Sequence, residues 1–189
     1  MIRQETENAK KGLPSGITVK VNSLVDPKII ELLYEASKAG VRVQLIVRGI
    51  CCLIPGIEGV SENITVMSIV GQLLEHSRIF RFENAGNPRI YMGSADWMPR
   101  NLDRRVELVF PIEDETQKAR AFGILDTMLS DTTNARFMQS DTSYEHVDLR
   151  GKKKISSQLT FYHEAQARLK ELQSIEKDSV LIPIHSAEE

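Results

Sequence analysis

The sequence contains little of what several common protein classes require. Its 189 residues include two cysteines and one tryptophan, and aromatic residues make up only 6%. Cys51 and Cys52 are adjacent, so a disulfide between them would be strained, and two thiols alone do not form a zinc site. We therefore expect both cysteines to be reduced and to be buried as small apolar side chains.

Long hydrophobic runs and an excess of one charge are also missing. No apolar stretch approaches the roughly 20 residues of a membrane-spanning helix, and the charged N-terminus does not resemble a signal peptide. We expect a soluble, cytoplasmic protein with no transmembrane segment, either free or attached to a membrane surface. The net charge of −2 provides no overall field to attract an anion, so any anion site has to be local. Low aromatic content and negative charge argue against a nucleic-acid partner.

The common catalytic and metal-binding signatures are absent as well. The chain has no Walker-type loop, no paired-cysteine metal motif and no kinase catalytic loop. Its apolar content of 41% and charged content of 26% are those of an ordinary globular domain. We expect one domain that contributes no metal ligands of its own.

The order of the elements predicts a mixed α/β domain. Residues 17–22 alternate between apolar and polar, as a strand does. Asp26 and Pro27 then open a helix that Gly40 ends, and residues 41–47 form a nearly continuous apolar strand. A strand, a helix and a strand in this order predict two parallel neighbours with a right-handed crossover.

The rest of the chain continues this pattern. We expect a loop at 49–63, strands at 64–69, 77–83, 89–94 and 105–110, a helix at 114–130, an irregular strand or hairpin at 135–149 and a last helix at 156–176. Residues 1–12 look like a helix without a proper beginning. We interpret residues 1–15 as a connecting helix from an upstream domain, residues 16–176 as the domain itself, and residues 177–189 as a weakly structured tail.

Cations lie at or near the carboxyl ends of two of the predicted strands. Arg48 comes directly after the apolar strand at 41–47, where open α/β sheets bind ligands. Gly49 behind it permits close approach of the backbone to a ligand, and a guanidinium suits phosphate oxygens. Lys20 and Asn22 share the polar face of the first strand near its carboxyl end. We expect these three side chains to bind phosphate.

His76 begins the strand predicted at 77–83 and shares one side of it with Arg78. A neighbouring cation favours the neutral form of an imidazole, which can act as an acid, a base or a nucleophile. His146, His163 and His185 lie in polar or charged surroundings, so we expect them to be solvated. We therefore interpret His76 as the catalytic candidate and Arg78 as a further phosphate ligand.

A third group of cations lies in or just after a loop near residue 100. Arg100 and Arg105 are further candidate phosphate ligands. Arg105 shares a strand face with Glu107, opposite Val106, Leu108 and Phe110, which we expect to be buried. Arg104 should point away. We predict that Arg48, His76 and Arg105 converge on one half-open pocket at the carboxyl side of the sheet, with Lys20 and Asn22 nearby.

Several segments resemble, in order, the C-terminal region of bacterial polyphosphate kinases. They are residues 20–27, 48–53, 61–64, 75–78 and 94–107. The resemblance implies a phospholipase D-like mixed sheet flanked by helices. It also implies that Arg48 and Arg105 hold nucleotide phosphates and that His76 assists transfer as an acid or a charge stabiliser. The reaction it implies moves the terminal phosphate of ATP reversibly to polyphosphate, through a phosphohistidine.

The same resemblance places the other parts of the enzyme outside this sequence. It implies that the phosphorylated histidine and most of the Mg²⁺ site belong to an upstream domain, so we expect the chain alone to be inactive. The partners it implies are ATP or ADP, inorganic polyphosphate and further copies of the full-length protein.

Two alternatives remain open from the residues themselves. The first is a phosphodiesterase of the phospholipase D type, in which two copies of the domain pair. That superfamily uses His-x-Lys followed by a Gly-Ser-x-Asn segment, and this chain has residues 76–78 and 93–96, with Arg78 replacing lysine and Asp96 replacing asparagine. The second is a non-catalytic module that binds polyanions.

Overall fold

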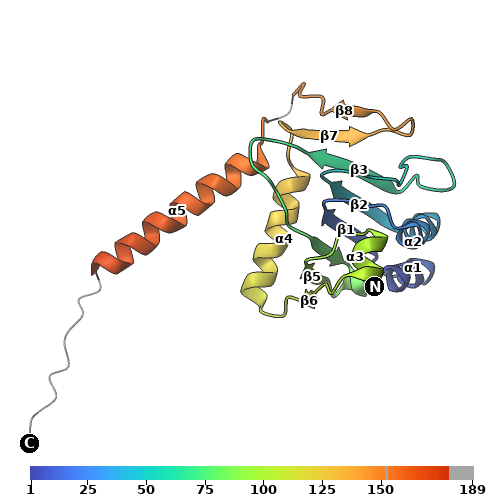
Figure 1. Ribbon diagram of the computed structural model, residues 1–189, viewed down its shortest axis with the longest axis horizontal. Coiled ribbons are helices and arrows are strands. Elements are labelled where there is room, and N and C mark those ends of the chain that lie inside the picture. The colour runs from blue at the N-terminus through green and yellow to red at the C-terminus, as the bar shows by residue number, and fades with distance from the viewer. Residues whose placement is uncertain (152, 179–189) are drawn as a thin grey trace, which may run out of the picture.

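An eight-stranded mixed sheet with helices on both faces forms the body of the chain (Figure 1). The computed structural model describes residues 1–151 and 153–178. The strands, in the spatial order β6-β5-β4-β1-β2-β3-β7-β8, are β1 (Gly16–Val21), β2 (Arg42–Val47), β3 (Ile64–Ile69), β4 (Ile79–Phe82), β5 (Arg89–Gly93), β6 (Val109–Pro111), β7 (Ala135–Met138) and β8 (Tyr144–His146). The helices are α1 (Ile2–Lys10), α2 (Pro27–Lys38), α3 (Pro99–Arg104), α4 (Glu115–Leu129) and α5 (Ser157–Asp178), with a 3₁₀ turn η1 at Asn84–Gly86.

The three central strands β1, β2 and β3 are parallel, and the outer pairs are antiparallel. Helices α1 and α2 cover one face of the sheet and α4 covers the other, each over its own apolar cluster. Strands buried on both faces read as continuous apolar runs, which is why residues 41–47 alternate so little. The predicted mixed α/β sheet is confirmed, and so is the parallel pairing of β1 with β2.

The caps of the helices follow the sequence signals. Asp26 accepts a hydrogen bond from the Ile29 amide at 2.9 Å and so begins α2. Asp114 accepts one from the Gln117 amide at 2.9 Å and begins α4. Among the described residues, no helix combines the length and the apolar character needed to cross a membrane.

The N-terminal helix is held to the domain by a buried carboxylate. Glu5 is fully buried and accepts hydrogen bonds from the amides of Gly16, at 3.0 Å, and Asn84, at 2.8 Å. It therefore ties α1 to the start of β1 and to η1. The connecting role expected for residues 1–15 stays a prediction. The tail expected from Lys177 lies, after Asp178, outside the described residues.

Three expectations about local structure are wrong. The loop expected near residue 100 contains the helix α3. The strand expected at 105–110 is only β6, an edge strand paired on one side with β5, so Val106, Leu108 and Phe110 are exposed rather than buried. Residues 105–108 stay outside the strand because α3 ends at Arg104 and the chain has to turn back to reach the edge of the sheet.

Two smaller differences concern a cysteine and a histidine. Cys52 is exposed, whereas Cys51 is partly buried, and burial raises the pKa of the Cys51 thiol to about 11. The strand expected at 77–83 begins only at Ile79. Lys20 Nζ holds the segment before it by donating hydrogen bonds to the backbone carbonyls of Glu75 and Ser77. His76 therefore lies in a loop rather than on a strand.

Candidate functional site

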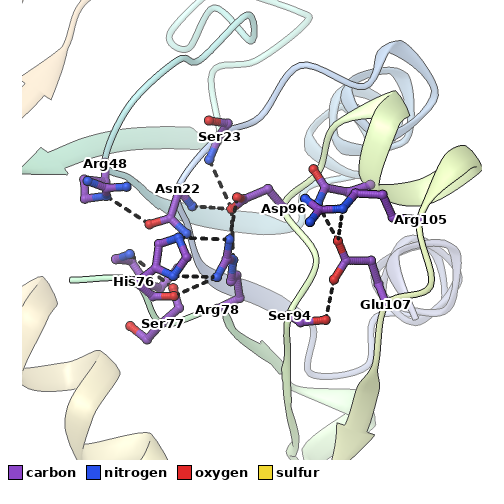
Figure 2. Close-up of polar contacts among 12 residues, drawn as sticks. Asn22, Ser23, Arg48, His76, Ser77, Arg78, Ser94, Asp96, Arg105 and Glu107 are labelled. Carbon is purple, nitrogen blue, oxygen red and sulfur yellow. Dashed lines mark hydrogen bonds and ion pairs between the residues drawn. The ribbon is translucent and has the colours of Figure 1, made fainter. Parts of the chain in front are cut away.

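Several of the candidate residues meet where β1 and β2 end. The parallel register of these strands pairs Val21 with Val47, so Asn22 and Arg48 leave the sheet side by side. The Gly49 amide donates to the Asn22 carbonyl at 2.8 Å, and this close pairing leaves little room for a side chain at residue 49. The loop that carries His76 lies beside these residues (Figure 2).

Asp96 is the hub of this site. Its Oδ2 forms an ion pair with Arg78 Nη2 at 2.8 Å, and its Oδ1 accepts from the amides of Asn22, at 2.7 Å, and Ser23, at 3.3 Å. Burial alone would raise the pKa of Asp96, but the hydrogen bonds from Arg78 and from the two amides outweigh it and hold this pKa below its usual value. Asp96 therefore stays ionised and fixes both the end of β1 and the Arg78 side chain.

Arg78 in turn fixes His76. Its Nη1 donates to the His76 carbonyl at 2.9 Å and lies 3.2 Å from His76 Nδ1, and its Nη2 lies 3.4 Å from Nε2. A guanidinium can only donate hydrogen bonds, so a ring nitrogen that accepts from it carries no proton. Both nitrogens of the exposed imidazole thus lie against the Arg78 guanidinium, which holds the ring in place, and in a neutral ring only one of them can accept from it.

Lys20 holds the same loop through hydrogen bonds to its backbone. Its side chain is 1% exposed, and its Nζ donates to the carbonyls of Ser77, at 3.2 Å, and Glu75, at 3.4 Å. Burial lowers the pKa of Lys20 to about 8; the charge of Glu75 acts in the opposite direction, and that of Arg48 lowers it further. The polar face predicted for the first strand, which carries Lys20, is buried, because β1 is covered on both sides.

Arg48 is the cation with the most free hydrogen-bonding capacity in this cluster. Its Nε donates to Asn22 Oδ1 at 2.9 Å, and within the described residues it pairs with no carboxylate. Asn22 is buried, and among these residues its Nδ2 has no hydrogen-bond partner. The terminal amino groups of Arg48 therefore retain donors for a ligand, beside the fixed imidazole of His76.

The structure does not bring every candidate into this cluster. Arg105 lies on the opposite side of Asp96 from Arg48 (Figure 2), where its Nε is 3.7 Å from Glu107 Oε1. Arg100 and Arg104 are exposed on α3, and their side chains make no hydrogen bond or ion pair with any described residue. Arg48, Asn22, Lys20 and His76 thus meet at one edge of the sheet, whereas Arg105 stands apart. They do not share the single pocket that was predicted, because Arg48 and His76 line two different concavities.

Glu107 explains the separate position of Arg105. Its Oε1 accepts from Asn101 Nδ2 at 2.6 Å, and its Oε2 accepts from the Ser94 hydroxyl. The hydrogen bonds from Ser94 and Asn101 lower the pKa of Glu107. Through Ser94, this carboxylate holds the end of β5 to the segment after α3. It also keeps the Arg105 side chain near Glu107 and away from Arg48.

Asp96 is absent from the candidate site residues predicted from the sequence. Its importance was visible in residues 93–96, which resemble the second half of the phospholipase D pattern. The structure joins the two halves of that pattern directly, through the Arg78–Asp96 ion pair. No group of three histidine, cysteine or carboxylate side chains that could hold a metal ion occurs within residues 1–151 and 153–178.

Comparison with known proteins places these features in a family. Residues 1–158 match the family model described as polyphosphate kinase C-terminal domain 2. A polyphosphate kinase from Lactiplantibacillus plantarum is 54% identical over 162 residues, which cover 86% of this chain and 23% of that protein. The chain therefore spans about a quarter of the length of this curated relative.

Solved structures agree with the sequence match. The crystal structure of polyphosphate kinase from Porphyromonas gingivalis superposes with a TM-score of 0.84 at 38% identity, over 88% of this chain and 26% of that one. Nuc from Salmonella typhimurium, a phospholipase D family member, gives a TM-score of 0.51 at 17% identity, over 73% of this chain and 91% of that one. The second likeness concerns the fold alone, and it confirms the predicted phospholipase D-like architecture.

Proposed function

Because this chain belongs to the polyphosphate kinase family, whose C-terminal domain 2 it matches, we propose that it forms one part of a phosphotransferase site. The reaction is the reversible transfer of the terminal phosphate of ATP to polyphosphate. The transfer passes through a phosphohistidine that lies elsewhere in the longer protein.

One observation carries this proposal. A guanidinium with no carboxylate partner among the described residues, that of Arg48, lies beside the end of β1, where Asn22 and Asp96 connect it to the loop of His76. Phosphoryl transfer requires little covalent chemistry from the protein. It requires fixed positive charge and fixed hydrogen-bond donors around the transferred phosphoryl group. This cluster provides both at one edge of the sheet.

Each residue has a separate role in the proposed mechanism. Arg48 binds the oxygens of the transferred phosphate with its terminal amino groups. His76 uses its protonated ring nitrogen to donate a proton or a hydrogen bond to a phosphate oxygen as negative charge develops there. Lys20 and Arg78, both already engaged, act as positioning residues for His76.

The remaining candidates take part from outside the cluster. We propose that Arg100, on α3, and Arg105, directly after it, bind nucleotide phosphates, since both side chains are exposed. Asn22 orients Arg48 through its Oδ1. The proposed partners are ATP or ADP and inorganic polyphosphate, in a homo-oligomeric cytoplasmic protein.

The described residues do not fit a magnesium site. The carboxylates of Asp96 and Glu107 already accept hydrogen bonds from arginine, serine, asparagine or backbone donors. Mg²⁺ prefers free carboxylate oxygens together with the phosphates of a substrate. We propose that the ion implied by the resemblance is held mainly outside this chain, and we derive no step through it.

The test uses the longer protein with His76→Ala, and His163→Ala, an exposed histidine on α5, as the matched control. Net polyphosphate synthesis should fall by a factor of about 10²–10⁴ in His76→Ala, the usual contribution of a general acid or base. Acid-labile phosphate on another histidine should persist. Unchanged synthesis would contradict the proposal, and phosphate on His76 during turnover would show that its role is covalent.

A further inference from the structure

A second concavity lies on the other side of Arg48 from Asn22. It has a volume of about 390 Å³, and its lining includes Arg48, Ser68, Asn134, Arg136 and Tyr144. Four of these five residues have no part in the site described above. Arg48 borders both regions, since its Nε contacts Asn22 while the same side chain lines the concavity.

The sheet places these residues next to one another. Strands β2, β3 and β7 are neighbours, and the register of β3 with β7 sets Ser68 directly opposite Arg136. The Ser68 hydroxyl donates to the Arg48 carbonyl at 3.2 Å. Arg48, Ser68 and Arg136 therefore follow one another across the sheet. Their arrangement depends on strand pairing, so it does not require a flexible loop to close.

The chemistry of the lining suits an anion. Two arginines face the concavity, no carboxylate lines it, and neither arginine forms an ion pair within the described part of the chain. Arg136 is exposed, so an anion can reach it. Asn134 Nδ2 donates to Ser156 Oγ at 3.2 Å and keeps its second hydrogen. Burial raises the pKa of Tyr144, so its hydroxyl keeps its proton and can donate.

We propose that this concavity is a second phosphate subsite, in which Arg136, Tyr144 and Asn134 hold the internal phosphates of a polyphosphate chain while its end lies near Arg48 and His76. This inference rests on the proposed function. It adds the direction in which the polyphosphate runs along the edge of the sheet. A nucleotide ends at its terminal phosphate, so the subsite would distinguish a long polyphosphate from ATP.

A polyphosphate chain fits this surface better than a nucleic acid does. Single-stranded nucleic acids bind by stacking bases on aromatic side chains along a basic groove. Tyr144 is the one aromatic residue in the lining of this concavity, and the whole chain carries a net charge of −2. Binding here would depend on the two guanidiniums and not on stacking.

The test measures equilibrium binding of long-chain polyphosphate, ATP and single-stranded RNA to the 189-residue chain by calorimetry. The variants are Arg136→Gln, Arg48→Gln and, as a matched control, Arg42→Gln. Arg42 is exposed at the opposite end of β2 from Arg48 and makes no side-chain ion pair or hydrogen bond with a described residue. Circular dichroism and thermal melts establish that each variant is folded.

Arg136→Gln should weaken polyphosphate binding about tenfold, the equivalent of one charge-assisted contact. ATP binding should change by less than about twofold, and Arg42→Gln should leave both affinities unchanged. Arg136→Lys should recover part of the loss, because a point charge keeps the attraction but lacks the fork.

Three results would overturn the subsite alone. In the first, polyphosphate affinity falls in Arg48→Gln but not in Arg136→Gln. In the second, Arg136→Gln loses ATP affinity and polyphosphate affinity equally. In the third, RNA binds as tightly as polyphosphate and depends on Arg136 in the same way. A chain that binds neither ATP nor polyphosphate would overturn the proposed function together with the subsite.

Discussion

Two pairs of cations near the same edge of the sheet differ in their surroundings. Lys20 and Arg78 are covered by protein, and each is occupied: Lys20 by two carbonyl groups, and Arg78 by Asp96 and His76. Arg48 and Arg136 line an open concavity and meet no carboxylate within the described residues. Residue type therefore does not reveal the role of a cation here. Satisfied cations hold the site together, and unsatisfied ones remain available for an anion.

The difference has a physical cause. A buried charge requires a partner, since removal from water costs several kcal/mol per ion. Arg78 and Asp96 have side chains only 11% and 10% exposed, so each needs the other. Arg48 and Arg136 keep contact with solvent and can remain without a carboxylate until a ligand arrives.

The largest effect is expected from Asp96→Ala. This substitution leaves Arg78 buried without its partner, so the free energy of unfolding should fall by about 3–5 kcal/mol. Asp126→Ala is the control, because Asp126 is 61% exposed and pairs with Arg81 at 3.4 Å; it should cost less than about 1 kcal/mol. Urea unfolding monitored by circular dichroism measures both. Similar losses in the two variants would contradict the role of Asp96 as the hub.

The same variant has a predictable pH dependence. The folded state holds the pKa of Asp96 below its usual value, so the stabilisation is fully present above the unfolded pKa of about 4. It is lost as the pH falls through the lower, folded value. The gap in stability between wild type and Asp96→Ala should therefore narrow on acidification below about pH 4. A gap that stays constant there would show that Asp96 contributes through packing alone.

A smaller effect is expected from the titration of Lys20. The folded state lowers its pKa to about 8, while the unfolded chain keeps a value of about 10.4. Between these values the unfolded state binds one more proton, so stability rises with pH. The difference in unfolding free energy, wild type minus Lys20→Met, should grow by up to about 3 kcal/mol from pH 8 to 10.5. A flat difference across this window would contradict the lowered pKa of Lys20 in the folded state.

The smallest effect is expected from Arg104→Ala. Arg104 is exposed at the end of α3, and its side chain makes no hydrogen bond or ion pair with a described residue. Surface substitutions of this kind change stability by less than about 0.5 kcal/mol, and polyphosphate affinity should likewise be unaffected. Urea unfolding and calorimetric titration measure the two quantities. A clear loss of polyphosphate affinity would show that an unpaired cation away from the strand ends also binds polyphosphate.

The fold was largely accessible from the sequence because local signals agreed with one another. Alternation at residues 17–22, the cap at Asp26 and the apolar run at 41–47 each indicated the same βαβ unit, which the structure contains. Residues 99–111 were not predictable in this way. Their helix and short edge strand depend on how the chain reaches β5, and parity alone gave the wrong orientation for Val106 and Leu108.

The site was predictable in its residue types but not in their partners. Arg48, Asn22, Lys20, His76 and Arg78 do meet near the ends of β1 and β2. The sequence could not show that Lys20 and Arg78 would be engaged by the loop and by Asp96, because these contacts join residues up to 57 positions apart. Nor did it draw attention to Arg136, which reaches the site only because β7 pairs with β3.

The most direct test of the account is the comparison of Arg48→Ala with Arg48→Lys in the longer protein. Arg48→Ala should reduce kcat/KM for polyphosphate synthesis by the equivalent of about 2–4 kcal/mol, while the free energy of unfolding changes by less than about 1 kcal/mol. Arg48→Lys should restore part of the activity. Near wild-type turnover in Arg48→Ala, or a loss of activity matched by an equal loss of stability, would contradict the claim that this free guanidinium binds the transferred phosphate.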